Sequence, residues 1–323
     1  MRIAVFRALQ LGDMLCAVPT LRALRAAYPD AEVTLVGLPW AHAFRERFAH
    51  LLDAFVEFPG FPGLPEQPAR LGELPRFVST AQSAEFDLAV QLHGSGEITN
   101  PLVLALAARE TAGFHPPGGW CPDSERFLPW PATGSEVRRL LALADHLGWP
   151  RRGDALEFPL EPEDFERLPL PNGDYVCIHP GARLEVRRWP ADEFASVADA
   201  LAGRGLEVVL TGSEAEADLV AAVEDAMRAP ATNVVGRTTL GGLAALVSRA
   251  RLVVCNDTGI SHVAAAVRAP SVVVVTTSDP DRWAPLDREL HRVVVRPDGV
   301  SDVLEAADAQ LERYSNPSRW TTA

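Results

Sequence analysis

Short apolar runs alternate with amphipathic segments along the first half of the chain. The run at residues 2–6 predicts a buried strand, and the apolar positions that follow predict a helix ending near Tyr28. A second strand is predicted at 32–36. A strand, a helix and a further strand in this order are typical of a parallel α/β sheet. The alternation continues through predicted strands at 54–58 and 87–91 and predicted helices at 40–48, 97–108 and 134–147.

The pattern restarts after a segment with little periodicity. Residues 151–172 hold four prolines and predict a linker. Beyond it, strands are predicted at 175–179, 207–210, 234–235, 252–255 and 271–275. Helices are predicted at 191–202, 214–226, 240–248, 261–267 and 301–314. In the first half, the stretches rich in proline and glycine at 59–75 and 115–131 predict loops.

This division indicates two α/β domains, each with its own parallel sheet. A chain of 323 residues also exceeds what one hydrophobic core usually supports. We expect an N-terminal domain of residues 1–165 and a C-terminal domain of residues 166–300. A final helix and tail, 301–323, could pack back toward the N-terminal domain. Two such sheets leave a cleft between their carboxyl ends, which is a usual place for a ligand.

Composition narrows the classes of function. The chain carries a net charge of −13, and its thirty basic residues are all arginine. An acidic chain argues against nucleic-acid binding, although local arginine clusters can still bind phosphate. The four cysteines form no C-x-x-C pair, and no signal peptide or membrane-length apolar run is recognised. We therefore expect a cytoplasmic protein with reduced cysteines that binds no nucleic acid but could still work at the membrane surface.

The clearest candidate site is the stretch at 252–263. Four apolar residues predict a strand, a polar turn of sequence NDTG follows, and a helix pattern then resumes. Ligands of parallel α/β sheets bind beyond the carboxyl ends of strands, and the first turn of a helix favours phosphate. Asp257 would add a carboxylate and Thr258 a hydroxyl, with His262 one turn further on. The alternative is an ordinary cap, in which Asp257 or Thr258 holds the first N–H groups.

Two other strand ends carry ionisable groups. Asp13, after Gly12, lies at or just inside the first predicted helix, where it could cap that helix or accept a proton from a hydroxyl nucleophile. Arg183, Arg187 and Arg188 follow the first strand of the second half. Their guanidinium groups could clamp a diphosphate, or they could form a solvated basic loop.

Weaker signals follow two more strands. Thr211 and Gly212 could contact a ligand or only cap a helix. The D-x-D pattern of Asp279 and Asp281 could hold a metal bound to a nucleotide diphosphate, but Pro280 between them also suits a turn. The chain has no P-loop, dinucleotide fingerprint or G-x-S-x-G motif, and its histidines show no ligand spacing with cysteine. The cysteines and histidines therefore do not indicate a zinc site, and the D-x-D pattern remains a weak candidate for a metal.

Together these motifs resemble glycosyltransferase family 9, the ADP-heptose:lipopolysaccharide heptosyltransferases. Residues 2–36 are similar to the start of that family, including the Gly-Asp pair and the P-x-L-x-x-L run. HPGA at 179–182 with RRWP at 187–190, and NDTGISH at 256–262, match its two main C-terminal motifs in the same order. The resemblance covers nearly the whole chain. It implies a GT-B fold, in which two Rossmann-like domains with parallel sheets face a central cleft.

The resemblance implies an inverting, metal-independent transfer of heptose from ADP-L-glycero-D-manno-heptose, without another cofactor. Asp13 would be the general base that deprotonates the acceptor hydroxyl, with Gly12 and His93 on the acceptor side. The implied donor-binding residues are Gly181, Arg187, Arg188, Thr211, Gly212, Thr238, Asp257, Thr258, Gly259 and His262. Among these, Asp257 would bind the sugar, Thr258 and Gly259 the phosphates, and Thr238 would lie by the adenine. His262 would support the loop.

The chain also departs from the family pattern. Thr276-Thr277 stand where many members have Gly-Pro, and Arg187 stands where a lysine is usual. The acceptor could be a lipopolysaccharide core, another glycan, a lipid-linked molecule or a small molecule. Use of another nucleotide sugar is one alternative function. A non-catalytic subunit that binds a sugar nucleotide is another.

Overall fold

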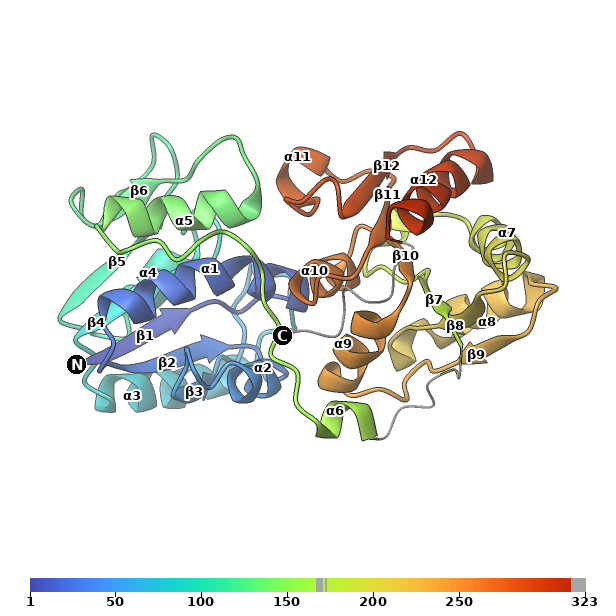
Figure 1. Cartoon of the computed structure of the whole chain (residues 1–323). Helices are drawn as coiled ribbons and strands as arrows, with labels where there is room; N and C mark the ends of the chain where they lie inside the picture. The colour runs from blue at the N-terminus through green and yellow to red at the C-terminus, as the bar shows by residue number, and fades with distance from the viewer. Residues whose placement is uncertain (167–170, 172, 315–323) are drawn as a thin grey trace. The chain divides into compact units, whose positions relative to one another are not determined.

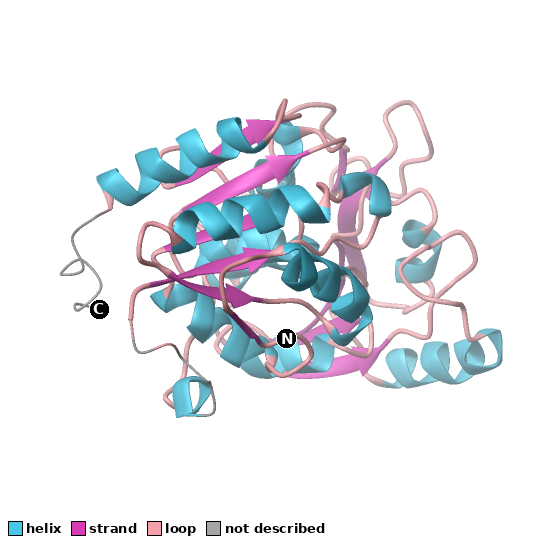
Figure 2. Cartoon of the chain, turned by 90° about the vertical axis from the view of Figure 1, so that its right-hand side faces the viewer, coloured by secondary structure: helices cyan, strands magenta, loops and turns pink. Residues whose placement is uncertain are grey.

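The computed structural model describes residues 1–166, 171 and 173–314. The chain divides into two compact units, Met1–Ala155 and Leu156–Ala323, and each contains one six-stranded sheet (Figure 1). Both units combine helices with strands (Figure 2), and along the chain a helix separates most consecutive strands. The α/β fold with two Rossmann-like parallel sheets is therefore confirmed. The division between the units falls inside the predicted linker, 151–172.

The sheet of the first unit has the strand order β3-β2-β1-β4-β5-β6, and every neighbouring pair is parallel. Its strands are β1 Arg2–Phe6, β2 Glu32–Gly37, β3 Ala54–Glu57, β4 Leu88–Gln91, β5 Glu110–His115 and β6 Phe127–Pro129. Central β1 is almost entirely apolar because both faces of a parallel sheet are covered. The strand order reverses between β1 and β4, which makes their carboxyl ends the expected ligand position.

The helices of the first unit follow the predicted pattern with two differences. They are α1 Leu11–Ala27, α2 Ala41–Arg47, α3 Leu74–Ser83, α4 Thr99–Leu104 and α5 Glu136–His146, with a 3₁₀ turn, η1, at Leu71–Glu73. Helix α3 was not predicted. Helix α4 ends earlier than predicted, and Ala107 just beyond it has a positive φ of 55°, which α-helical backbone does not adopt.

The sheet of the second unit has the strand order β12-β11-β10-β7-β8-β9, again parallel throughout. Its strands are β7 Tyr175–His179, β8 Glu207–Leu210, β9 Ala231–Asn233, β10 Leu252–Asn256, β11 Ser271–Val275 and β12 His291–Val295. The α-helices are α6 Glu163–Glu166, α7 Ala191–Ala202, α8 Ala217–Ala226, α9 Leu240–Arg249, α10 Gly259–Ala266, α11 Pro280–Trp283 and α12 Val300–Arg313. Two 3₁₀ turns, η2 Glu185–Arg187 and η3 Glu214–Glu216, precede α7 and α8.

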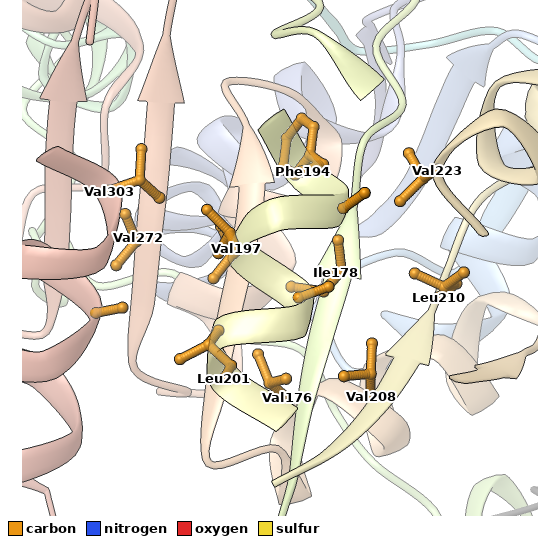
Figure 3. Close-up of a cluster of buried hydrophobic side chains, with 14 of the residues drawn as sticks. Val176, Ile178, Phe194, Val197, Leu201, Val208, Leu210, Val223, Val272 and Val303 are labelled. Carbon is orange, nitrogen blue, oxygen red and sulfur yellow. The ribbon is translucent and has the colours of Figure 1, made fainter. Parts of the chain in front are cut away.

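The core of the second unit lies where α7 and α12 cover one face of the sheet. Val197 and Leu201 of α7 pack over Val176 and Ile178 of β7 (Figure 3). Val303 brings α12 into the same cluster, so the last described helix is part of this unit's core. Full burial of one such side chain stabilises the fold by about 1.5–3 kcal/mol. The cluster therefore helps to hold the carboxyl ends of β7, β10 and β11 in place within the second unit.

Four strands account for the remaining differences from the sequence-based expectations. Strand β9 lies at 231–233, where 234–235 was predicted, and β12 was not predicted at all. In the first unit, β5 was missed, and β6 lies inside the stretch predicted as a loop at 115–131. Strands β6, β9 and β12 are the outermost strands at their ends of the sheets, and β5 lies next to β6. Most side chains of β9 and β12 are only partly buried or exposed, so the apolar pattern there is weak. No helix among the described residues is long and apolar enough to cross a membrane.

Candidate functional site

The loops of the second unit that carry the predicted donor residues leave the sheet side by side. Strand β10 pairs in parallel with β7 on one side and with β11 on the other. The strand order reverses between β7 and β10, which is where open α/β sheets bind their ligands. We call the three segments that follow these strands, 180–190, 257–258 and 276–279, the strand-end cluster. It contains half of the implied donor-binding residues: Gly181, Arg187, Arg188, Asp257 and Thr258.

Asp257 is the first residue after β10 and is 3% exposed. Its backbone N–H donates to the carbonyl of Val274 at 2.9 Å, which holds it against β11. The carboxylate oxygen Oδ2 accepts a 2.5 Å hydrogen bond from Ser278 Oγ, whereas Oδ1 is buried and has no hydrogen-bond partner in the described part of the chain. A buried acceptor without a donor costs about 1–3 kcal/mol. A hydroxyl group of a ligand would satisfy Oδ1.

Helix α10 begins without the ordinary cap that was the alternative interpretation. Thr258 is the N-cap residue, and its side chain makes no capping hydrogen bond. Its carbonyl accepts hydrogen bonds from the N–H and the hydroxyl of Ser261, at 3.0 and 2.8 Å. The Asp257 carboxylate is bound to Ser278 instead of the first turn. An uncapped helix N-terminus attracts anions through its N–H groups and its dipole.

Asn256 is a residue of this site that sequence reasoning did not assign. It is the last residue of β10 and has no exposed surface. Its Oδ1 accepts a hydrogen bond from the Trp189 N–H at 3.0 Å, and its Nδ2 donates to the Pro180 carbonyl at 2.7 Å. One side chain therefore ties both ends of the arginine loop, 180–190, to β10. The sequence feature that could have identified Asn256 is its position as a polar residue at the end of an apolar strand.

The arginines of this loop have different environments. Arg187 is half-buried, and its guanidinium group forms no hydrogen bond or ion pair within the residues that the structure describes. In contrast, Arg188 Nε donates to the Ala182 carbonyl at 2.9 Å, and its Nη1 lies 3.8 Å from the Glu185 carboxylate. Arg183 is exposed. Arg187 is therefore the arginine best prepared for an anion, while Arg188 braces the loop.

The residues of the loop after β8 mainly contact other residues of the protein. The hydroxyl of Thr211 is buried, lies 3.0 Å from His179 Nδ1 and donates to the Ile178 carbonyl. Burial lowers the pKa of His179, partly opposed by the charge of Glu216. The Glu216 carboxylate also occupies the space beside Gly181, where an added Cβ would lie 2.1 Å from its Oε1. A larger residue at position 181 would therefore require the carboxylate of Glu216, which was not predicted, to move.

The other predicted donor residues lie at element boundaries. Gly212 packs against α8, where an added Cβ would lie 3.1 Å from a Val220 methyl group. Thr238 is half-buried and lies just before α9, which the hydroxyl of Thr239 caps by accepting from the Gly242 N–H. His262 is buried in the first turn of α10. Gly259 is the first residue of the same helix.

In the first unit, Asp13 lies half-buried in the first turn of α1, two residues after the helix begins. Its backbone is held by Arg7, which is 1% exposed and follows β1. Arg7 Nε and Nη2 donate to the Asp13 carbonyl at 3.0 and 2.5 Å, and Nη1 donates to the Leu92 carbonyl. Buried Glu136 lies 3.9 Å from Arg7. These contacts link the segments after β1 and β4, where the strand order reverses.

His93 and Gly12 lie at the same reversal. His93 is 9% exposed, and its Nδ1 accepts a hydrogen bond from the Ala8 N–H at 3.4 Å. Burial and the nearby charge of Arg7 lower the pKa of His93 to about 3, so its ring is neutral near pH 7. Gln91, which was not predicted, donates to the His93 carbonyl at 2.6 Å. His93 is therefore a fixed neutral group and a poor proton acceptor.

The D-x-D pattern forms a helix start. Asp279 caps α11 by accepting from the Asp281 N–H at 3.0 Å. Among the described residues, no group of three or more histidine, cysteine, aspartate or glutamate side chains is arranged to hold a metal ion. The four cysteines are thiols outside any disulfide, in agreement with the expectation, and burial raises the pKa of Cys177 and Cys255.

Known proteins resemble this chain in sequence and in fold. The family model of glycosyltransferase family 9 (heptosyltransferase) matches residues 79–305. Lipopolysaccharide heptosyltransferase 2 of Escherichia coli K12 is 28% identical over 90% of this chain and 86% of its own length. A family 9 glycosyltransferase from Veillonella parvula superposes with a TM-score of 0.80 at 22% identity, covering 97% of both chains. E. coli ADP-heptose lps heptosyltransferase II superposes with a TM-score of 0.77 at 22% identity, covering 98% of this chain and all of its own.

The matched region includes β4, His93 and the whole strand-end cluster, and it spans well over half of the chain. The 28% identical relative extends the similarity over most of the remainder. The chain therefore belongs to glycosyltransferase family 9, the heptosyltransferase family, and is a glycosyltransferase.

Proposed function

We propose that this protein is an inverting heptosyltransferase that uses ADP-L-glycero-D-manno-heptose as its donor. The observation that carries the proposal is the buried Oδ1 of Asp257, which has no hydrogen-bond partner among the residues described and lies just before α10, in the same strand-end cluster as Arg187. Such a site offers an acceptor for a sugar hydroxyl together with two positively polarised groups for a diphosphate. One solved neighbour, the E. coli heptosyltransferase WaaC, is described with ADP, in agreement with this donor class.

In this proposal the second domain binds the donor through separate groups. Asp257 accepts a hydrogen bond from a heptose hydroxyl. Arg187 and the first turn of α10, with Thr258 and Gly259, contact the diphosphate. Thr238 lies near the adenine, and Gly181, Thr211, Gly212, Arg188 and His262 shape the pocket. The negative charge that develops on the leaving diphosphate is stabilised by these fixed positive groups.

Asp13 is the proposed general base. An acceptor hydroxyl oxygen attacks the anomeric carbon while the bond from that carbon to the diphosphate oxygen breaks. ADP leaves with the electron pair, the hydroxyl proton passes to Asp13, and the configuration at the anomeric carbon inverts. His93 is a weak candidate for this role because its pKa of about 3 makes it a poorer proton acceptor than an ordinary carboxylate. Arg7 holds the Asp13 backbone in place.

Positive potential from Arg187 and α10 would stabilise the negative charge on the leaving diphosphate, which a metal ion does in other nucleotide-sugar transferases. We therefore propose metal-independent catalysis. The acceptor in this proposal is a hydroxyl on a lipopolysaccharide core or a related glycan, as the names of the curated relatives suggest. Transfer that persists at full rate in EDTA would agree with this mechanism, whereas loss of activity restored by Mn²⁺ would contradict it.

The test is transfer of heptose from pure ADP-heptose to a panel of core oligosaccharides, monitored by mass spectrometry. The wild-type protein should release ADP and form a product whose anomeric configuration is opposite to that of the donor, which NMR of the anomeric proton would show. Asp13→Asn should lower kcat by about 10²–10⁴-fold with little change in the affinity for ADP-heptose. Full activity of Asp13→Asn would refute its role as base. Binding of UDP-sugars in preference to ADP-heptose, or binding without transfer to any acceptor, would refute the proposed function.

A further inference from the structure

Three consecutive hydroxyl residues, Thr276, Thr277 and Ser278, follow β11 within the strand-end cluster. All three hydroxyl groups donate hydrogen bonds to the other two segments of the cluster. The proposed function gives none of them a role. Their contacts define what they contribute.

Ser278 acts on the Asp257 carboxylate. The Oγ–Oδ2 distance of 2.5 Å is typical of a charge-assisted hydrogen bond from a hydroxyl to a carboxylate. Both residues are at least partly buried, so water replaces this bond poorly. Because Oδ2 is held by Ser278, the carboxylate cannot rotate freely about its Cβ–Cγ bond. The remaining oxygen, Oδ1, is then kept in one position with its lone pairs unused.

Thr276 and Thr277 act on the arginine loop. Their hydroxyl groups donate to the same acceptor, the carbonyl of Val186, at 2.9 and 3.2 Å. Val186 lies on η2 and immediately precedes Arg187. Its side chain is 65% exposed, so packing does little to hold this part of the loop. The turn itself is closed by hydrogen bonds from the Arg187 and Arg188 N–H groups to the carbonyls of Leu184 and Glu185. The two threonines therefore add the side-chain contacts that tie this turn to the segment after β11, next to the Arg187 guanidinium group.

We propose that residues 276–278 are the positioning segment of the donor site, with separate effects on its two halves. Ser278 orients Asp257 so that Oδ1 receives the sugar hydroxyl, and the two threonines place Arg187 at the diphosphate. This inference rests on the proposed function, because it takes a nucleotide-diphospho-sugar as the ligand. None of the three residues touches the reacting atoms; each acts through a neighbour that binds the ligand.

The separation of effects makes the inference testable with two ligands, ADP and ADP-heptose. Ser278→Ala should raise KM for ADP-heptose about tenfold, because one hydrogen bond to a charged group is lost, while Kd for ADP by calorimetry stays within about twofold. Ser278→Thr retains the hydroxyl and should restore KM. The double variant Thr276→Val, Thr277→Val should weaken ADP and ADP-heptose by the same factor, because both carry the diphosphate.

Ser248→Ala is the matched control. Ser248 is also half-buried and donates to a backbone carbonyl, that of Ala245, but it lies within α9 away from the cluster. It should leave both ligands unaffected. A crystal structure of Ser278→Ala should show the Asp257 carboxylate rotated or in two conformers, whereas the wild type has one.

The outcomes separate this inference from the proposed function. An unchanged KM in Ser278→Ala, or equal weakening of ADP and ADP-heptose, would overturn the role of Ser278 in an otherwise active enzyme. An unchanged Kd for ADP in the double threonine variant would overturn the role of Thr276 and Thr277. A wild-type protein that does not bind ADP-heptose would overturn the proposed function. In that case the Asp257 conformation in Ser278→Ala would still decide whether Ser278 orients the carboxylate.

Discussion

Replacing Asn256 by aspartate changes one buried atom in the centre of the strand-end cluster. The oxygen that accepts from the Trp189 N–H at 3.0 Å is retained. The nitrogen that donates to the Pro180 carbonyl at 2.7 Å becomes a second oxygen, so a hydrogen bond is replaced by a contact between two acceptors. Asn256 has no exposed surface, and water therefore does not relieve this contact.

The expected cost follows from these contacts. Loss of the hydrogen bond contributes about 1 kcal/mol, and the unpaired carbonyl and buried carboxylate oxygen add about 1–3 kcal/mol. We therefore expect Asn256→Asp to lower the free energy of unfolding by about 2–4 kcal/mol at pH 8. Burial favours the protonated form of the new carboxyl group, which can again donate to Pro180. Its folded-state pKa is raised, so the missing stability returns as the pH falls toward 4.

The assay compares urea unfolding of the wild type and the variant, followed by circular dichroism at pH 8 and pH 4. Hydrogen exchange of the peptide covering 180–190 should also increase at pH 8, because Asn256 ties both ends of that loop. Asn233→Asp is the matched control: its Nδ2 donates to Glu224 at 2.6 Å, but solvent screens that site, and we expect a loss below about 1 kcal/mol. Equal losses at both positions, or a loss at 256 that does not change with pH, would refute the reasoning.

Two further predictions concern the arginine loop and the first domain. Arg187→Ala should raise Kd for ADP about tenfold or more, and Arg187→Lys should have an intermediate Kd. Arg188→Ala should instead act mainly by lowering the stability of the protein. Calorimetry measures the ADP affinity and thermal unfolding the stability, and equal ADP affinities of the two alanine variants would contradict the assignment. His93 has a folded-state pKa of about 3, below its unfolded value, so its contribution to stability is present above about pH 6.5 and is lost as the pH falls toward 3. Substitution His93→Asn, which cannot titrate, should flatten the decrease in unfolding free energy between pH 7 and pH 4, and an unchanged slope would count against a buried neutral imidazole.

The amino-acid sequence by itself determined the architecture and the places where chemistry could occur. Apolar runs such as 252–255 form central strands because both faces of a parallel sheet are buried, and this leaves a clear pattern. Asp257, which directly follows such a run, lies at a carboxyl strand end for the same local reason, and Arg187 lies in the loop that follows β7. Together with the spacing of the motifs, this was enough to predict two parallel sheets and the family.

Only the tertiary structure decided how these residues are held. Asn256 contacts Trp189 and Pro180, which lie 67 and 76 positions away, and Ser278 contacts Asp257 from 21 positions away. Local patterns carry no information about such pairs, because strand order and register bring them together. The outer strands β9 and β12 were misplaced or missed for a related reason: half-buried edges impose a weak apolar pattern. The structure also showed that neither the Asp257 nor the Thr258 side chain caps α10. The Asp257 carboxylate accepts a hydrogen bond from Ser278 instead.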